Sequence, residues 1–170
     1  MKEPAEVQIV WQEERRCLTL EGETVLEYVL CWPKVEGGGL GGRWISRYYA
    51  HLARSWRQRW EREVYWRACL ELAARRESAR PFVPWRGELG GETVLLRDGV
   101  LSLRFHGSEI RGDSRPARVR WGDVWTLGEG APKPLHRLFR TQRGWRSRLW
   151  EAVFRQGEAR RQSGDCFLAV

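Results

Sequence analysis

A long segment with helical periodicity lies between two groups of strand-like segments, and this order constrains the fold more than any other feature. From Arg43 to Glu77 apolar residues recur three and four positions apart, which is the period of an amphipathic helix. At 1.5 Å per residue the helix spans roughly 50 Å, so we expect a bend or break near its middle. An aromatic stripe of this kind favours core packing over a platform for stacking nucleic-acid bases. The stripe comprises Ile45, Tyr49, Leu52, Trp56 and Trp60, widened by Tyr48, Trp66 and Leu70.

Three strand-like segments precede the helix and predict a meander. In the first, Val7, Ile9 and Trp11 alternate with polar residues, as in a strand with one buried face. Pro33 is expected to end the third strand, because proline has no amide hydrogen for a ladder. The predicted strands cover residues 7–12, 17–20 and 24–32, with turns at Glu13–Arg15 and Gly22.

More strands follow the helix, between Glu92 and Leu127. Asp98-Gly99 between two apolar runs is a strong signal for a hairpin, and Gly112 marks a bend. Trp85 and Phe82 are expected to anchor the connector by burial. The predicted elements are strands at 92–96, 100–105 and 117–127, a helical turn at 135–139 and a last helix with the stripe Trp145, Leu149, Ala152 and Val153.

These elements together predict an α+β fold in a single domain over residues 1–170. We expect an antiparallel sheet of about five to seven strands in two meanders, packed against one long tryptophan-rich helix. A shorter C-terminal helix follows it. Residues 157–170 are predicted to be a mobile or truncated segment, although Phe167–Val170 is apolar enough to begin another element.

The chain is basic, with a formal charge of +8 and eleven tryptophans, and its lysines are only Lys2, Lys34 and Lys133. An excess of arginine over lysine is most simply a compositional bias that affects solubility and partners rather than fold. The alternative is a nucleic-acid-binding protein, since arginine neutralises phosphate and tryptophan stacks on bases. That interface would consist of Arg111, Arg115, Arg118 and Arg120 near Trp121 and Trp125.

The four cysteines, Cys17, Cys31, Cys69 and Cys166, have neither C-x-x-C spacing nor a neighbouring histidine. We therefore predict free, buried thiols in a reducing compartment and no metal site. A Cys17–Cys31 disulfide stays open if their strands are neighbours. The sequence shows no signal peptide and no transmembrane segment. It is expected to be cytoplasmic as given, or extracytoplasmic if a leader has been removed.

Catalytic patterns are weak, and no catalytic residue or cofactor is predicted. The glycine-rich run at 36–42 lacks the Lys and Ser/Thr of a phosphate-binding loop, so we interpret it as a flexible connection into the helix. No nucleophile motif is present. The remaining enzyme hypothesis is a hydrolase-type site centred on His106, which follows a strand, with Glu109 or Asp113 beside the bend.

Four motifs carry a resemblance to a known family. They are YVLCWPKV, a strand with a proline; WISRYYAHL, a helix start with Ser46 in the place of an asparagine; RDGVLSLRF, a hairpin; and GDVWTLGEGAPKPLHRLF, with Asp123, Gly130, Leu135 and Phe139. From about Val25 to Phe154 the chain resembles the RsiV-like domain of unknown function, found in the outer portion of the lysozyme-sensing anti-sigma factor RsiV and in the peptidoglycan deacetylase PdaC.

The resemblance implies a bacterial α+β module that binds a protein or cell-envelope ligand without catalysis. Two departures limit it. Family members often carry Gly-Gly-Ala-His at the bend, where this chain reads Ile110 to Ser114, IRGDS. They are also typically extracytoplasmic, and their final strand region is expected to be shortened here after Val170. Lysozyme sensing is therefore not carried over. A non-enzymatic binding or sensing module is the favoured function, and the candidate ligand residues are His106, Glu109, Arg111, Asp113, Arg115, Arg118, Arg120, Trp121 and Trp125.

Overall fold

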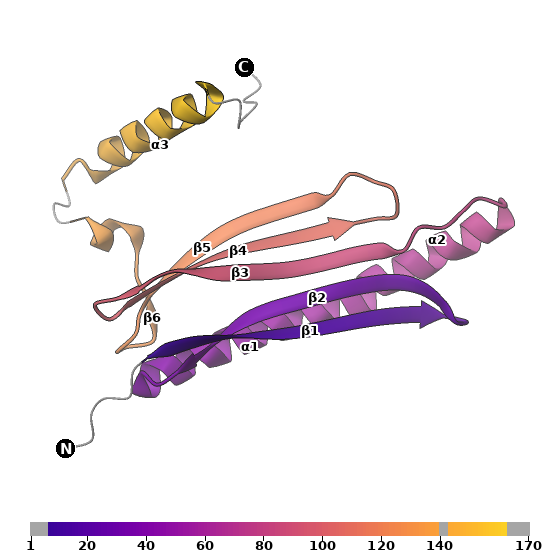
Figure 1. Ribbon diagram of the computed structural model, residues 1–170, viewed down its shortest axis with the longest axis horizontal. Helices are drawn as coiled ribbons and strands as arrows, with labels where there is room; N and C mark the ends of the chain where they lie inside the picture. The colour runs from indigo at the N-terminus through magenta and orange to yellow at the C-terminus, as the bar shows by residue number, and fades with distance from the viewer. Residues whose placement is uncertain (1–6, 140–142, 163–170) are drawn as a thin grey trace. The chain divides into compact units, whose positions relative to one another are not determined.

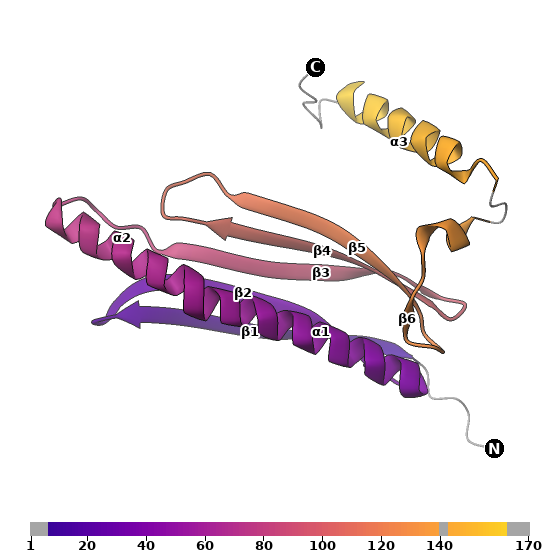
Figure 2. The same ribbon diagram turned by 180° about the vertical axis from the view of Figure 1, so that it is seen from behind.

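The long helix lies along one face of a six-stranded sheet, and no described helix of the same unit lies on the opposite face (Figures 1 and 2). The computed structural model describes residues 7–139 and 143–162. It contains two compact units, Met1–Pro132 and Lys133–Val170. In the first unit the strands are β1 (Gln8–Leu20), β2 (Glu23–Glu36), β3 (Trp85–Arg97), β4 (Val100–Ile110), β5 (Ala117–Thr126) and β6 (Ala131–Pro132). The helix comprises α1 (Gly39–Arg59), a π-helical segment η1 (Trp60–Val64) and α2 (Tyr65–Glu77).

The strands follow one another across the sheet in sequence order, and the predicted α+β fold is confirmed. All pairs are antiparallel except β2–β3, which is parallel from Leu26 opposite Trp85 to Leu30 opposite Leu89. The long helix explains this exception. It carries the chain from the end of β2 back to the level of its start, so β3 runs in the same direction as β2.

The predicted turn at Glu13–Arg15 is wrong, because β1 is one continuous strand paired with β2 along its whole length. As an edge strand, β1 holds charged side chains that reach solvent or the helix, and Glu14 pairs with Arg57 of α1. Pro33 does not end β2 either. Because β3 accompanies β2 only as far as Leu30, β2 has one partner strand at Pro33, where a proline is tolerated.

Within the glycine-rich run, Gly37 and Gly38 connect β2 to the helix as predicted, but Gly39 to Gly42 already form the first turn of α1. Gly41 and Gly42 are buried within the helix. A Cβ atom on Gly41 would lie 1.8 Å from the carbonyl oxygen of Leu127 and 2.7 Å from the amide nitrogen of Gly130. The glycine therefore allows the helix backbone to touch the backbone that joins β5 to β6.

The buried face of the helix follows the predicted stripe only up to Trp60. From there buried residues recur at every fourth position, Trp60, Val64, Ala68 and Leu72, with Cys69 buried beside Ala68. An ideal α-helix has 3.6 residues per turn, and the wider π turn of η1 absorbs the difference. Trp66 and Leu70, predicted to widen the stripe, are instead 61% and 71% exposed, and Tyr48 is 48% exposed.

The core between the helix and the sheet is aromatic, as predicted. Trp60 lies against Tyr28 with ring centroids 5.1 Å apart, and Phe105 stacks between Tyr49 and Trp121. The predicted anchors of the connector also pack here, with Trp85 buried and Phe82 beside it. Every tryptophan from Trp11 to Trp125 belongs to the helix or to the sheet face that packs against it.

The hairpin and the bend after the helix are confirmed. Asp98 and Gly99 both have positive φ, 51° and 72°, which a two-residue turn between twisted strands requires. Gly112, with φ 55°, begins the loop between β4 and β5.

The second unit contains a 3₁₀ turn, η2 (Leu135–Leu138), where a helical turn was predicted, and the helix α3 (Trp145–Gln162). Helix α3 includes the first part of the segment predicted to be mobile. Cys166 and the predicted element at Phe167–Val170 lie outside the described residues. Mobility there and a single domain over residues 1–170 stay predictions. No described helix is long and apolar enough to cross a membrane.

Candidate functional site

The face of the sheet opposite the helix, which we call the open face, carries a polar surface made by strands β3 to β5. Along β4 the residues Leu101, Leu103 and Phe105 are buried in the core, so the alternate residues point to the other side. Cross-strand pairing then aligns them in rows. Glu88, Ser108 and Arg118 form one row, and Gly90, His106 and Arg120 form the next.

Two grooves on the open face adjoin each other and share lining residues. The first, of about 620 Å³, extends over β3, β4 and the beginning of β5; its lining includes Glu92, Arg104, His106, Arg118 and Arg120. The second, of about 560 Å³, extends over β1 to β4; its lining includes Arg15, Cys17, Glu27 and Arg86. Both contain Glu88, Ser108 and Ile110. An elongated ligand that crosses the sheet would therefore meet both grooves along its path.

Small residues make the floor of this path. A Cβ atom on Gly90 would lie 2.4 Å from Cε1 of His106, so the glycine allows the imidazole to lie flat over β3. In that position His106 Nε2 is 3.3 Å from Glu88 Oε1, and both side chains are about half exposed. Beside them Arg104 pairs with Glu92 across the same two strands.

Three arginines of the open face differ from Arg104 and from several helix arginines, because they have no carboxylate partner among the described residues. Helix arginines Arg57, Arg59 and Arg75 each bind a carboxylate, from Glu14, Glu109 and Glu71 respectively. On the open face, by contrast, no described carboxylate lies within ion-pair distance of Arg86, Arg118 or Arg120. These guanidinium groups have donors directed at solvent, and they are suited to binding carboxylate or phosphate oxygens.

Glu109 lies on the helix side of the sheet, so the structure does not bring it together with His106. Its carboxylate accepts hydrogen bonds from Arg59 Nε at 2.9 Å, Arg59 Nη2 at 3.1 Å and Trp60 Nε1 at 3.1 Å. Burial by itself would raise the pKa of Glu109, but these hydrogen bonds and the charge of Arg59 outweigh it and lower the pKa below its ordinary value of 4.5. Glu109 therefore holds the helix to β4.

Replacing Glu109 by glutamine should lower the free energy of unfolding at pH 7 by about 1–3 kcal/mol, because the charged acceptor is lost. A carboxylate with a lowered pKa stabilises the fold above pH 4.5 and loses that effect as the pH falls through the folded-state pKa. The difference between wild type and Glu109→Gln in urea unfolding should thus shrink toward acid pH. Exposed Glu129 gives the control, Glu129→Gln, and an equal loss at all pH values would contradict this role.

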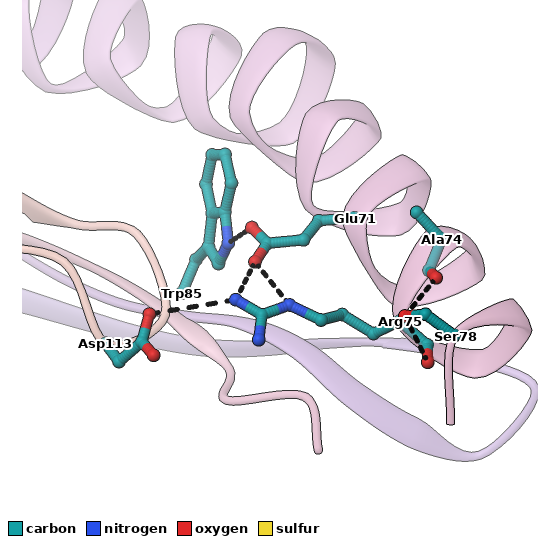
Figure 3. Close-up of polar contacts among 6 residues, drawn as sticks. All are labelled: Glu71, Ala74, Arg75, Ser78, Trp85 and Asp113. Atoms are coloured by element: carbon teal, nitrogen blue, oxygen red, sulfur yellow. Dashed lines mark hydrogen bonds and ion pairs between the residues drawn. The ribbon is translucent and has the colours of Figure 1, made fainter. Parts of the chain in front are cut away.

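Asp113 belongs to a cluster at the end of the helix, shown in Figure 3, and Arg111 lies beside that cluster. Glu71 accepts a hydrogen bond from Trp85 Nε1 at 2.8 Å and from Arg75 Nη2 at 2.9 Å. The same Arg75 nitrogen lies 3.7 Å from Asp113 Oδ1, and the Arg111 guanidinium lies over the Trp85 ring at 5.5 Å. Asp113 therefore ties the β4–β5 loop to α2, and Arg111 ties it to Trp85 of β3.

Ser78 closes the helix in the same view. Its hydroxyl donates to the carbonyl oxygens of Ala74 and Arg75, at 2.9 and 3.2 Å. Both carbonyl groups also accept backbone hydrogen bonds, from Ser78 N and Arg80 N, so the Ser78 hydroxyl adds a second donor to each.

Trp121 and Trp125 lie on the helix side of β5. Trp125 is 5% exposed, and its Nε1 donates to the Tyr49 hydroxyl at 2.6 Å, which in turn donates to Asp123 Oδ2 at 2.9 Å. Burial and the charge of Asp123 raise the pKa of Tyr49.

Of the predicted site residues, the structure brings together His106, Arg118 and Arg120 on the open face, and it places Arg115 on the exposed β4–β5 loop. The two tryptophans do not flank these arginines.

Sequence reasoning missed Arg86, Glu88, Arg104 and Ser108 as members of this surface. For Arg86 and Glu88 a signal was present, since they alternate with Gly87 and Leu89 and continue the strand pattern upstream of Glu92. β3 in fact begins at Trp85. The strand was started too late because the glycines interrupt its apolar run.

The described cysteines are free, and Cys17 and Cys31 do not pair. Their strands are neighbours, but Cys17 lies opposite Glu27 and Cys31 opposite Glu13. This offset of four residues is roughly 13 Å along the strands, whereas a disulfide requires Cα atoms within about 7 Å. No group of three or more described His, Cys, Asp or Glu side chains is arranged to hold a metal ion.

Comparisons with known proteins give a likeness of fold. No family model and no curated protein matches the sequence. A crystal structure of a DUF3298 family member from Bacteroides fragilis superposes with a TM-score of 0.56 at 13% identity, covering 79% of this chain and 62% of the other. A DUF3298 protein from Pseudomonas aeruginosa PAO1 gives a TM-score of 0.47 at 11% identity, covering 89% and 64%. The chain thus spans less than two thirds of either protein, and in fold it is similar to the DUF3298 member from Bacteroides fragilis.

Proposed function

We propose that this protein is a non-enzymatic binding module that holds a protein or cell-envelope ligand on the open face of its sheet. One observation carries the proposal, namely the surface of two adjoining grooves across β1 to β5. Its arginines Arg86, Arg118 and Arg120 have no carboxylate partner among the described residues. Its elongated form suits a polymer or an extended peptide. The RsiV-like resemblance supports the choice of ligand class.

The geometry gives little support to a hydrolase centred on His106. General acid–base catalysis needs its groups within reach of one reacting atom. His106 lies on the open face and Glu109 on the helix side, while Asp113 is 72% exposed on the β4–β5 loop beside Arg75. These three side chains do not share a pocket.

Nucleic acid is a second candidate ligand, favoured by the unpaired arginines. It is the weaker one for two reasons. Trp121 and Trp125, the predicted stacking residues, lie on the other face of the sheet. Glu88 and Glu92 also place negative charge in the groove, where they would repel a continuous phosphate backbone.

A groove-filling substitution tests the proposal. The probes are soluble peptidoglycan fragments, casein as an unfolded acidic protein, and single-stranded oligothymidylate, each measured by fluorescence anisotropy. We expect the wild type to bind peptidoglycan fragments or casein, and Ser108→Trp to weaken that binding at least about tenfold. Arg54→Glu, on the exposed side of α1, lowers the net charge of the protein away from the grooves, and it shows how much of the binding depends on net charge alone.

Three results would overturn the proposal. The first is an absence of binding to both peptidoglycan fragments and casein. The second is binding that Ser108→Trp leaves unchanged while the variant keeps its unfolding temperature. The third is hydrolase or deacetylase turnover by the pure protein.

A further inference from the structure

The outer edge of β5 is open over most of its length. In the described part of the chain β6 pairs only with Trp125 and Thr126, so no strand lies beside residues 117–124 on that side. Residues Ala117 to Arg120 are exposed. An edge of this kind has backbone N–H and C=O groups without a strand partner, and it can accept another extended segment.

The opposite edge of the sheet is protected differently. β1 carries charges of both signs that neutralise each other along the strand, with Arg15 bound to Glu13 and Arg16 bound to Glu14. On β5 the charges that point to the open face, Arg118 and Arg120, have one sign, while Asp123 lies on the helix side. Arg118 and Arg120 have no described carboxylate partner, so the β5 edge favours an incoming strand that supplies negative charge.

The two faces of β5 differ in chemistry. Arg118 and Arg120 point to the open face, whereas Val119 and Trp121 point to the helix side. Val119 is 46% exposed and borders a hollow of about 290 Å³ that Trp56 and Gly107 also line. In a strand added beside β5, side chains would lie in rows with these residues. Acidic residues would therefore face the arginines, and apolar residues would face Val119 and the hollow.

We propose that the β5 edge binds an extended segment of a partner protein in which acidic and apolar residues alternate, so that the segment becomes the next strand of the sheet. This inference rests on the proposed binding function and names the class of partner. A second copy of this chain fits poorly, because pairing two β5 strands would bring arginines of like charge together. Nucleic acid does not present acidic and apolar groups on alternate sides of its chain, so it does not match the two faces of β5.

The probe is a short, end-blocked synthetic peptide of alternating glutamate and valine. We expect it to bind the full chain at pH 7 at least about tenfold more tightly than the matching lysine–valine peptide. Hydrogen exchange of the amides in residues 117–124 should slow when the glutamate–valine peptide is bound. The double variant Arg118→Glu/Arg120→Glu should reverse the preference between the two peptides, and Arg54→Glu should leave it unchanged.

A backbone control separates strand addition from charge attraction. N-methylation of alternate residues removes the amide donors from one edge of the peptide, so binding should be lost when the methylated edge is the one that meets β5. The proposal is overturned if binding stays intact whichever of the two edges is N-methylated, if the two charge patterns bind equally, or if oligothymidylate binds more tightly than the glutamate–valine peptide.

The two proposals can fail separately. If the glutamate–valine peptide does not bind but Ser108-dependent binding of peptidoglycan fragments or casein persists, the strand addition alone is wrong. If the peptide binds as expected while Ser108→Trp changes no binding of those larger probes, the edge proposal stands and the groove proposal is wrong.

Discussion

Replacing Trp60 by alanine should lower the free energy of unfolding by about 3–5 kcal/mol, which is the cost of truncating a large buried aromatic side chain. Trp60 is 0% exposed and lies at the start of the π-helical segment, with its ring against Tyr28. Its indole nitrogen also donates to Glu109. Truncation would leave a cavity between the helix and β3, and it would remove a donor from a carboxylate that has little access to water.

Guanidinium unfolding followed by circular dichroism measures this effect, and Trp66→Ala is the matched control. Trp66 lies on the same helix but is 61% exposed, so its loss should change stability by less than about 0.5 kcal/mol. Similar losses for the two variants would contradict the assigned faces of the helix.

Gly87 offers an internal check of the Trp60 packing. A Cβ atom on Gly87 would lie 2.7 Å from Cε2 of the Trp60 ring. Gly87→Ala should therefore destabilise the wild type and be close to neutral in a Trp60→Leu background. The difference between the two backgrounds is a direct coupling energy between these residues.

Gly41→Ala should destabilise the protein by about 3 kcal/mol, although alanine is the better helix former. Helix propensity alone would make this substitution stabilising by about 1 kcal/mol. The new Cβ atom would, however, lie 1.8 Å from the carbonyl oxygen of Leu127, which is a backbone atom and cannot rotate away. Overpacking of this kind costs about 1–3 kcal/mol or more, so the sign of the change shows which effect is larger.

Thermal unfolding is sufficient to measure the Gly41 effect, since 1 kcal/mol corresponds to about 2–4 °C in a chain of this size. Gly128→Ala lies close by and is the control, because its Cβ atom would meet nothing within 4 Å. A stabilising Gly41→Ala would mean that the start of α1 does not touch the β5–β6 connection.

Part of the fold could be predicted because its signals are local. The Asp98-Gly99 turn and the alternating strands on both sides of it need only neighbouring residues to specify them. The continuity of β1 was not predictable in this way. Glu13 to Arg16 form a charged run typical of a turn, and only the pairing with β2 and the contact of Glu14 with Arg57 make it a strand.

The side of the helix that is buried beyond Trp60 could not be predicted from the sequence either. A period of 3.6 places Trp66 and Leu70 near the buried stripe, but the π turn at Trp60–Val64 rotates the following residues. Packing selects this turn because Trp60 fits over Gly87 and Val64 then enters the same core. The sequence of the helix alone does not predict the π turn.

The site was predictable in part. His106 and Glu109 are three residues apart on one strand, and an odd separation places side chains on opposite faces. That rule alone separates the two residues of the enzyme hypothesis. The partner of His106, in contrast, depends on the register between β3 and β4, which brings Glu88 beside it from the preceding strand. That the two grooves adjoin depends further on the parallel β2–β3 pair, which is set by the helix between them.

The most direct test of the open face as the ligand surface is a side-chain map by nuclear magnetic resonance. Between Trp11 and Trp125 the tryptophans belong to the helix or to the sheet face beneath it, so indole signals report that side, while the His106 imidazole reports the open face. Titration with whichever of peptidoglycan fragments or casein binds should shift the His106 ring signals and leave the indole signals of Trp60 and Trp125 in place. Shifts in the exposed helix tryptophans Trp44 and Trp66 with His106 unchanged would place the ligand on the helix and contradict the proposed function.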